Sequence, residues 1–581
     1  MSEQQTVIHA GLQLQLGIHS CAGTKPLNQD FAAARVPPEP ELTIKGAAFA
    51  VADGISSSSV SHVASETAVT SFLEDYFCTS DSASVRQAGC QVLQATNAWL
   101  DSQNRQSPYR GNPDKGYVCA FSALVIKGRH AHLFHIGDAR IYLLRAGRLQ
   151  QLTRDHRQAA AGQESYLSRA LGAAPDVSID YQQLLLKTED ILLLLTDGIS
   201  DVLDEAQLLQ LVQQHQADLS YAASMLTAAA SAAGSDDNLT AMLVQVQQLA
   251  VVTSGMPVLD AQLAVPGELQ PDRLFDGYRV IRRLHASHRS HLYLVEDSET
   301  RQQMVLKAPA TDMAADEAYL QRLMLEDWIA RRVNSQHVIR AIPAVRPRHY
   351  IYTVAEYIAG QTLRQWLSDH PQPSLSQVRD IIAQVGKGLQ ALHRAEILHQ
   401  DLRPENIMID ADGRVKIIDL GSARVAGLAE LHGEMNHQGL GTAIYAAPEY
   451  FLGEAGTERS DLFSLAVLCY HMLSGRFPYG TRVARCHTLA QQKRLQYLSV
   501  CDDHSDIPRW LDETLKKALQ MQPEQRYQEL SVFLYDLNYP NPAYQQLPYR
   551  PLIQRDPLRF WQLVSLVLLF SNLYMLYLLI Q

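Results

Sequence analysis

Residues 399–406 read HQDLRPEN, and they are followed by IDLG at 418–421 and by APE at 447–449. Upstream of them, residues 305–307 read VLK, so that a lysine closes an apolar run. Transfer of a phosphoryl group requires a base beside the acceptor hydroxyl, metal ligands beside the phosphates, and a cation on the α- and β-phosphates. These segments supply each part in order, which indicates a phosphotransfer domain in the second half of the chain.

The order of these motifs resembles that of the eukaryotic-type protein kinases. The resemblance covers residues 274–538 and implies a bilobal kinase fold over residues 274–540, with ATP and Mg²⁺ as cofactors and proteins carrying Ser or Thr as substrates. It implies that Asp401 is the catalytic base, and it also implies roles for other residues. These are Lys307 on the phosphates with Glu326 as its partner, Arg403 at the γ-phosphate, Asn406 and Asp419 on Mg²⁺, Glu356 to Ile358 as the hinge beside adenine, and Ser287 and Ser290 in the loop over the phosphates.

Two departures from the kinase pattern bear on activity. Gln400 stands where many kinases have the Arg that receives a phosphorylated activation loop, so activity is not expected to depend on that modification. The loop over the phosphates, expected as G-x-G-x-x-G, reads LHASHRSH at 284–291 and contains no glycine. Hydroxyl groups can offer hydrogen bonds there, but the conformational freedom of glycine is lost. The alternative of a pseudokinase that senses nucleotide or recruits substrate therefore stays open.

In the first half, carboxylates follow apolar runs that read as strands. Asp53 follows AVA at 50–52, Asp138 follows HIG at 135–137, and Asp197 follows LLT at 194–196. Strand ends converge on one rim of a sheet, and hard divalent cations prefer carboxylate and carbonyl oxygens. A single Asp-Gly pair is more often only a turn, so the prediction of a metal site depends on the whole set.

This set, taken in order, resembles the metal-dependent (PPM-type) serine/threonine protein phosphatases over residues 9–247. The segments that carry the resemblance are NQD at 28–30, VADG at 51–54, GDAR at 137–140, DGISD at 197–201 and DNLT at 237–240. The resemblance implies a β-sandwich flanked by helices over residues 9–248 and two or three Mn²⁺ or Mg²⁺ ions. It implies that Asp53, Asp197, Asp237 and the Gly54 carbonyl hold two ions, that Asp138 helps to hold a third, and that Asp30 orients water. Lys25 stands where the family usually has an Arg that binds phosphate, and a lysine cannot form the bidentate fork.

Length and composition set the outer limits. The 581 residues exceed one domain of about 150 residues. The formal charge of −11 gives no general basic field, so nucleic acid is not an expected partner. The seven cysteines form no C-x-x-C pair, which favours a reducing compartment, and the N-terminus lacks the basic and apolar regions of a secretion signal.

Residues 560–580 read FWQLVSLVLLFSNLYMLYLLI and contain no charged residue. About 20 apolar residues suffice to span a bilayer, so one C-terminal transmembrane helix is predicted, with a buried core helix as the alternative. Arg550, Arg555 and Arg559 precede it, which predicts an anchor in the cell inner membrane with the catalytic domains in the cytoplasm. Asn572 could support self-association within lipid.

The chain is therefore predicted to be a multi-domain α+β protein with a linker at 249–273, rich in Pro and Gly, and a juxtamembrane segment at 541–559. Strands are expected at 47–51, 120–126, 133–136, 191–195 and 240–246, and helices at 219–233 and 317–332. The preferred interpretation is a bifunctional enzyme with a phosphatase and a kinase. A phosphatase joined to a pseudokinase is the first alternative, and a scaffold with both sites silent is the second.

Overall fold

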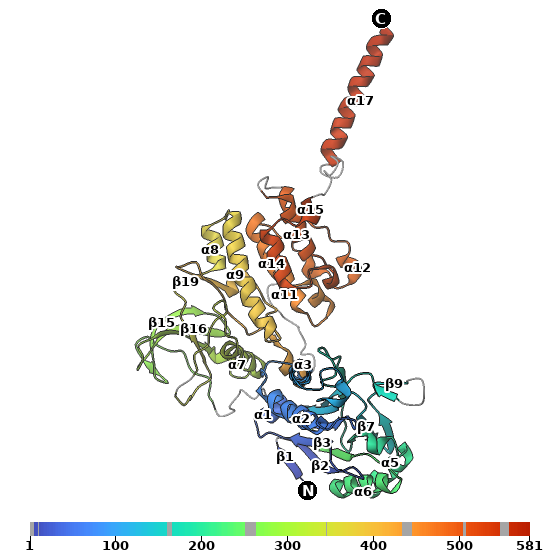
Figure 1. The fold of residues 1–581 in the computed structure, drawn as a ribbon. Coiled ribbons are helices and arrows are strands. Elements are labelled where there is room, and N and C mark those ends of the chain that lie inside the picture. The colour runs from blue at the N-terminus through green and yellow to red at the C-terminus, as the bar shows by residue number, and fades with distance from the viewer. Residues whose placement is uncertain are drawn as a thin grey trace. The chain divides into compact units, whose positions relative to one another are not determined.

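The computed structural model describes residues 5–9, 11–159, 165–249, 263–343, 346–432, 444–502, 507–545 and 557–580. Most of the predicted linker and most of the predicted juxtamembrane segment lie outside these residues. The contacts divide the chain into two compact units. The first comprises Met1–Gln361, Lys387–Asp401 and Asn406–Gly441, and the second comprises Thr362–Gly386, Leu402–Glu405 and Thr442–Gln581. Figure 1 labels many of their helices and strands.

Two antiparallel sheets form the N-terminal part of the first unit. One has the order β1-β2-β13-β12-β7-β8, and the other has the order β11-β6-β5-β4-β3. The strands of the first sheet are β1 Gln5–His9, β2 Leu12–Cys21, β13 Leu239–Gln248, β12 Ile191–Leu195, β7 Arg140–Arg145 and β8 Arg148–Gln151. Those of the second sheet are β11 Asp180–Leu185, β6 His130–Ile136, β5 Cys119–Lys127, β4 Ala47–Gly54 and β3 Phe31–Arg35. A separate hairpin pairs β9 Arg157–Ala159 with β10 Ser165–Leu167.

The two sheets pack face to face because their central strands are apolar on both sides. One buried cluster joins Phe49 and Val51 of β4 to Leu192 and Leu194 of β12. The alternate residues of β12, among them Leu193, face the opposite way and join a second cluster. A strand buried on both faces reads as a continuous apolar run, as ILLLL at 191–195 does. This arrangement is the predicted β-sandwich.

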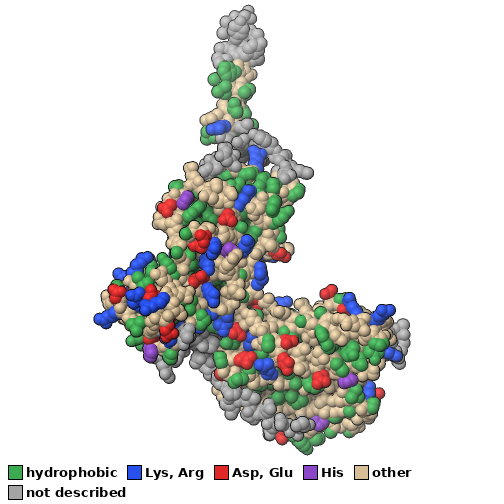
Figure 2. Space-filling model, turned by 60° about the vertical axis from the view of Figure 1, so that its left-hand side comes forward, with side chains coloured by type: hydrophobic (Ala, Val, Ile, Leu, Met, Phe, Trp, Pro, Cys, Tyr) green, Lys and Arg blue, Asp and Glu red, His purple; other side chains and the backbone are tan. Residues whose placement is uncertain are grey.

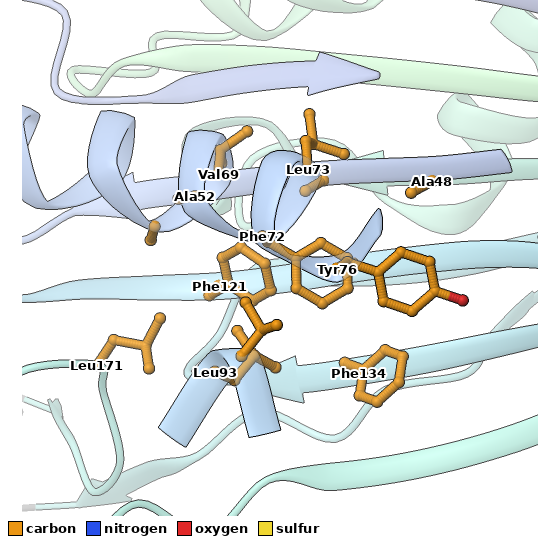
Figure 3. Close-up of a cluster of buried hydrophobic side chains, with 14 of the residues drawn as sticks. Ala48, Ala52, Val69, Phe72, Leu73, Tyr76, Leu93, Phe121, Phe134 and Leu171 are labelled. Carbon is orange, nitrogen blue, oxygen red and sulfur yellow. The ribbon is translucent and has the colours of Figure 1, made fainter. Parts of the chain in front are cut away.

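Helices cover the outer face of each sheet. Against the second sheet lie α2 Ser61–Cys78 and α3 Val85–Gln106, and Figure 3 shows Phe72 and Tyr76 of α2 beside Phe121 and Phe134 of the sheet. Phe72 meets Phe121 edge to face at 5.4 Å between ring centroids. Against the first sheet lie α5 Glu205–Gln214 and α6 Leu219–Ala232. Two short helices, α1 Glu41–Lys45 and α4 Asp197–Ser200, complete this part.

The strands and helices expected in the first half of the chain are confirmed, within a few residues at their ends. Helix α5 begins at a capping box in which Asp204 and Gln207 satisfy each other's backbone N–H groups. Helix α3 begins after Ser84, whose hydroxyl accepts from the Gln87 N–H. Both features are the local signals by which a sequence starts a helix.

A five-stranded antiparallel sheet follows in the first unit, in sequence order β14-β15-β16-β17-β18. Its strands are β14 Leu274–Phe275, β15 Tyr278–Ala286, β16 Ser290–Asp297, β17 Gln303–Pro309 and β18 Thr353–Glu356. The expected helix is α7 Glu317–Arg332, capped by the Asp316 side chain. Shorter elements of the same part are β20 Ile397–Leu398, β21 Ile407–Asp410, β22 Val415–Ile417, β23 Arg424–Val425 and α10 Ala426–His432. The long helix α9 Leu375–Arg394 begins in the second unit and ends in the first, and β19 Gly360–Thr362 lies where the first unit passes into the second.

The second unit is mainly helical. Its helices are α8 Leu363–Asp369, α11 Glu458–Ser474, α12 Leu489–Gln492, α13 Arg509–Ala518, α14 Leu530–Asn538, α15 Pro542–Gln545 and α17 Pro557–Ile580. The buried side chain of Arg526 donates to both carboxylate oxygens of Glu449 at 2.7 Å. Ser460, at the start of α11, donates to the same carboxylate at 2.6 Å. This network holds the turn at Glu449 against the helices.

The helix expected at 560–580 forms as part of α17. Its apolar side chains from Trp561 to Phe570 are largely exposed, and Figure 2 shows them as a green surface on the described part of this helix. Within the part of the chain that the structure describes, however, no helix meets the length and hydropathy required of a membrane span. The side chains after Asn572 lie outside that part. The prediction of a transmembrane helix is therefore not confirmed by the described residues.

Candidate active sites

The acidic site of the sandwich is organised around Asp30, which immediately precedes β3. Asp30 Oδ2 accepts hydrogen bonds from the hydroxyls of Thr196, at 2.9 Å, and Thr240, at 2.7 Å. Its other oxygen, Oδ1, is buried and has no hydrogen-bond partner among the described residues. Burial is the main reason that the pKa of Asp30 is raised to about 7. An unpartnered buried carboxylate oxygen is costly, which is a reason to expect a ligand or water there.

Asn238 fixes the loop that carries Asp30. Its side-chain oxygen accepts from the Gln29 N–H at 2.8 Å, and its amide nitrogen donates to the carbonyls of Ala22 and Leu27 at 2.9 and 3.0 Å. The segment DNLT at 237–240 therefore has a structural role besides its acidic residue, since Asn238 and Thr240 both position the loop ending at Asp30.

Asp53 and Gly54 end β4 within reach of the other carboxylates. Desolvation, followed by the charges of Asp197 and Asp30, raises the pKa of Asp53 well above its usual range. A side chain at Gly54 would meet the Gln29 carbonyl at 2.8 Å and the Ser61 Cβ at 2.9 Å. Only glycine fits this approach, which lets the end of β4 pack closely against the loop that carries Asp30.

Arg157 joins the two carboxylates that follow β6 and β12. Its Nε donates to Asp138 Oδ2 at 2.7 Å, and its Nη2 donates to Asp197 Oδ2 at 2.9 Å. Asp138 is buried, and burial raises its pKa even though the guanidinium lowers it. Burial likewise raises the pKa of Asp197 to about 6, with the charge of Asp138 as the second cause.

Asp237 completes the acidic site. Lys25 Nζ lies 3.4 Å from Asp237 Oδ1, and the Ser56 hydroxyl donates to Asp237 Oδ2 at 3.0 Å. The structure thus brings the predicted residues Lys25, Asp30, Asp53, Gly54, Asp138, Asp197 and Asp237 to one rim. Among the described residues, no three His, Cys, Asp or Glu side chains are arranged as a ready metal-binding group. The donors themselves suit Mn²⁺ or Mg²⁺, and with the unpartnered oxygen of Asp30 they fit such ions.

Lys307 is the centre of the site predicted in the second half. It lies on β17, opposite Thr353 of β18, and its Nζ donates to Glu326 Oε2 of α7 at 2.6 Å. The same Nζ lies 3.7 Å from Asp419 Oδ1. Asp419 adopts a left-handed backbone with φ of 63°, which non-glycine residues rarely do outside functional turns. Desolvation is opposed by the charges of Glu326 and Asp419, and the net effect raises the pKa of Lys307.

The predicted catalytic base is held by its neighbours. Asn406 Nδ2 donates to the Asp401 carbonyl at 2.9 Å and to its carboxylate at 3.1 Å, and the Asn406 carbonyl accepts from Ile418. Asp401 and Asn406 are thus brought together. Arg403 belongs to the second unit, where its Nε lies 3.5 Å from Glu405 Oε2.

At the predicted hinge, the Glu356 side chain accepts from Lys416 at 2.6 Å and from the Arg340 N–H at 2.9 Å. Its carboxylate therefore has partners within the protein. Ile358 is 9% exposed, so it is a buried apolar residue. These contacts fix the direction of the chain after β18.

The glycine-free loop is a hairpin closed by Ser287. The Ser287 hydroxyl accepts from the N–H groups of Arg289, at 3.2 Å, and Ser290, at 3.0 Å, and donates to the Ser290 carbonyl at 3.1 Å. In a phosphate-binding loop these N–H groups point at the ligand. Here Ser287 satisfies them, so the predicted use of its hydroxyl on phosphate competes with a structural role.

Comparison with protein families gives two matches. The model described as "Protein kinase domain" matches residues 278–533, and the model described as "Protein phosphatase 2C" matches residues 19–244. The chain therefore contains a protein kinase domain and a phosphatase domain of the 2C type. Both families generally use Mg²⁺ or Mn²⁺, and kinases use ATP.

The curated relatives include bacterial serine/threonine-protein kinases. A probable serine/threonine-protein kinase of Clostridium acetobutylicum is 24% identical over 267 residues, which are 46% of this chain and 40% of that protein. The serine/threonine-protein kinase PknB of Mycolicibacterium smegmatis is 30% identical over 275 residues, 46% of this chain and 43% of that protein. The chain thus spans less than half the length of these relatives.

Among solved structures, a crystal structure of the Mycobacterium tuberculosis PknI kinase domain is 24% identical, and the match covers 47% of this chain and 99% of that chain, with a TM-score of 0.37. A crystal structure of a double mutant of that domain has 25% identity and the same TM-score.

Sequence reasoning missed three contributors to the acidic site. Arg157 directly follows residues 152–156, which read LTRDH, and a basic residue next to this segment was an available signal. Thr196 and Thr240 stand within the quoted motifs, but their shared acceptor, Asp30, is 166 and 210 residues away. No local sequence pattern predicts a contact between residues so far apart in the chain.

Proposed function

We propose that the chain is a bifunctional signalling enzyme. Its phosphatase domain hydrolyses phosphoserine and phosphothreonine with divalent metal ions, and its kinase domain transfers the γ-phosphate of ATP to Ser or Thr of proteins. The observation that carries the proposal is that one chain holds both the carboxylate rim around Asp30 and the Lys307–Glu326 ion pair beside Asp419. Each group matches the needs of one half of a phosphorylation cycle.

In the phosphatase domain, Asp53, Asp197, Asp237 and the Gly54 carbonyl would hold two Mn²⁺ or Mg²⁺ ions. When bound, the ions supply charge neutralisation of the phosphoryl oxygens and activation of a water molecule. Asp30 is fixed through one oxygen by Thr196 and Thr240, which leaves its other oxygen to orient the attacking water and to accept its proton. No nucleophile from the protein is required.

Lys25 would bind the substrate phosphate at the rim. Its ammonium group is 3.4 Å from Asp237 and about a third of its side chain is exposed, so it can exchange one anionic partner for another. A lysine acts as a point charge and makes no bidentate fork, which supports weak binding of phosphate with little geometric selectivity. This suits a phosphatase that accepts more than one phosphoprotein.

In the kinase domain, Lys307 would bind the α- and β-phosphates, and Glu326 holds its ammonium group in position. Asn406 and Asp419 would hold Mg²⁺, and Asp401 would accept the proton of the substrate hydroxyl. Arg403 would neutralise the γ-phosphate, and the chain from Glu356 to Ile358 would face adenine. Gln400, in a left-handed conformation with φ of 65°, replaces an arginine that could receive a phosphate, which supports activity without activation-loop phosphorylation.

The test uses the full-length chain with two assays on one preparation. Release of phosphate from a phosphothreonine peptide with Mn²⁺ measures the phosphatase, and transfer of labelled phosphate from ATP to a Ser/Thr protein substrate measures the kinase. Asp237→Asn is expected to abolish only the first activity, and Asp401→Asn only the second. Phosphatase activity that survives Asp237→Asn would refute the assignment of the phosphatase domain. Kinase activity that survives Asp401→Asn would refute the assignment of the kinase domain.

A second candidate, a phosphatase joined to a pseudokinase, is favoured by Ser287. Its hydroxyl occupies the N–H groups of Arg289 and Ser290 that a glycine-rich loop would aim at phosphate. Under this alternative the protein binds ATP without transferring phosphate. Tight ATP binding measured by calorimetry, together with no labelled transfer at any Mg²⁺ or Mn²⁺ concentration, would select it over the active kinase.

We further propose that the C-terminal helix attaches the protein to the cell inner membrane, with both domains in the cytoplasm. The uncharged segment at 560–580, the exposed apolar side chains of α17 and the arginines before it support this. Asn572 donates to the Leu568 carbonyl at 2.9 Å, and its amide carries a second N–H and an oxygen that self-association would use. Deletion of residues 557–581 should move the protein from the membrane pellet to the supernatant; an unchanged distribution would refute the anchor.

A further inference from the structure

Arg157 uses three nitrogens on three different carboxylates. Besides its bonds to Asp138 at 2.7 Å and Asp197 at 2.9 Å, its Nη1 donates to Asp201 Oδ2 at 2.6 Å. About three quarters of the Arg157 side chain is buried, and that of Asp138 is 7% exposed. These distances are those of strong charge-assisted hydrogen bonds. A single guanidinium therefore lies where the carboxylates that follow β6 and β12 meet.

The backbone next to Arg157 is fixed, so the contact is built into the fold. The His156 N–H donates to the Gly137 carbonyl at 2.8 Å, and the Gly137 N–H donates back to His156 Nδ1 at 3.1 Å. This reciprocal pair places residue 157 directly beside residue 138. The His156 Nε2 also lies 3.0 Å from Asp180, which fixes the ring.

Asp201 is held from its other side. Arg140 donates to Asp201 Oδ1 at 2.9 Å, to the Ser200 carbonyl at 2.7 Å and to both oxygens of Asp155. Asp201 therefore stands between two guanidinium groups, with one oxygen on each. Its orientation toward Arg157 does not depend on a metal ion.

Three buried or half-buried carboxylates that lie together need a compensating charge, because a low-dielectric environment magnifies their repulsion. A divalent cation can supply it, and so can a guanidinium that is always charged and offers donors in a rigid fork. A guanidinium and a divalent cation repel each other and compete for the same carboxylates. Arg157 donates to the Oδ2 atoms of both Asp138 and Asp197, so it opposes a divalent ion between these two residues.

We propose that Arg157 is a resident cation that takes the place of a third divalent ion at Asp138. The acidic site would then hold two ions, on Asp53, Asp197 and Asp237, and Arg157 would position Asp197 for them. This inference rests on the proposed metal-dependent phosphatase, and it makes the charge at Asp138 a permanent part of the protein, independent of metal concentration.

The test counts Mn²⁺ ions bound to the full-length chain, without nucleotide, by equilibrium dialysis and calorimetry after removal of metals with a chelator. Arg157→Gln removes the charge, Arg157→Lys retains it, and Asp138→Asn removes the proposed acceptor. Arg154→Gln is the matched control, since the same change is made three residues away at an exposed side chain. Contributions from the kinase domain are the same in every variant and cancel in the comparison.

Arg157→Gln is expected to bind one more Mn²⁺ than wild type, and Asp138→Asn in that background is expected to abolish the additional ion. Asp138→Asn in the wild type, Arg157→Lys and Arg154→Gln should leave the number unchanged. A wild-type protein that loses one ion on Asp138→Asn, or an Arg157→Gln variant equal to wild type, would overturn the inference while the metal-dependent phosphatase stands. Absence of Mn²⁺ binding to the acidic site in every variant would refute both.

If Arg157→Gln does not fold, Arg157→Lys and Asp138→Asn still decide the question. A second measurement is the thermal unfolding midpoint in chelator. Arg157→Gln should lower it more than Arg154→Gln does, and Mn²⁺ should restore most of the loss. A midpoint that Mn²⁺ does not raise would also count against Arg157 as a substitute for an ion.

Discussion

Lys307 Nζ on β17 donates to Glu326 Oε2 on α7 at 2.6 Å, which joins the five-stranded sheet to its helix through one charged pair. Asp419 lies 3.7 Å from the same nitrogen, so the lysine is shared between two carboxylates. The charge of Lys307 partly offsets the rise in the pKa of Glu326 that burial causes. A nucleotide phosphate that enters the site would therefore meet a lysine already oriented by its partners.

Glu326→Gln is expected to reduce kcat/KM for ATP in the kinase assay by about 10- to 100-fold, because a charge-assisted hydrogen bond that orients Lys307 is lost. Glu317→Gln, the same change at an exposed position in the first turn of α7, is the control and should have little effect. Equal activity of the two variants would show that the Lys307–Glu326 pair does not position the nucleotide.

Asp237→Asn is expected to lower Mn²⁺-dependent phosphopeptide hydrolysis by at least about 100-fold, because a neutral amide replaces a hard anionic ligand in a two-metal site. Asp236→Asn changes the neighbouring, exposed carboxylate and should retain activity. Chelation of metal should abolish the wild-type activity, and added Mn²⁺ should restore it. Full activity of the chelated protein would contradict the assigned reaction.

Arg526→Gln is expected to destabilise the second unit by about 3–5 kcal/mol, because it leaves Glu449 buried without its bidentate partner. Differential scanning calorimetry of the full-length chain should show the transition of that unit at a lower temperature. Lys516→Gln, which removes a partly exposed pair with Glu513 on α13, should cost less than about 1 kcal/mol. Similar losses in both variants would argue against the buried network as a stabilising element.

The burial of His132 predicts that the phosphatase domain becomes less stable as the pH falls. It lies buried on β6, its Nδ1 is 2.8 Å from the Tyr181 hydroxyl, and burial lowers its pKa from 6.5 to about 3. As pH falls below 6.5, His132 binds a proton in the unfolded chain but stays neutral in the folded domain. The free energy of unfolding therefore decreases by about 1.4 kcal/mol per pH unit until pH approaches 3. His132→Asn should weaken the domain at pH 7.5 but reduce the slope of stability against pH by about one proton. Urea unfolding at pH 4.5 to 7.5 measures this slope, and an unchanged slope in the variant would contradict the assignment.

Local sequence was enough to predict the elements that carry the sites. The continuous apolar run ILLLL at 191–195 predicts a strand that is buried on both faces, as β12 is. Asp197 comes just after this strand, which predicts that its carboxylate lies at the edge of the sheet. The motif order also predicted the two domains that the family comparison finds. The predicted domain limits and the roles of the site residues remain predictions.

Only the tertiary structure decided which groups meet these residues. The partners of Asp30, Thr196 and Thr240, come from separate strand ends of the opposite sheet, and the cation at Asp138 comes from the hairpin that follows β8. The use of Ser287 to close its own loop is equally absent from the motif. The physical reason is that a sequence pattern fixes the face and the end of an element through its periodicity, whereas side-chain contacts depend on strand register and on segments hundreds of residues apart.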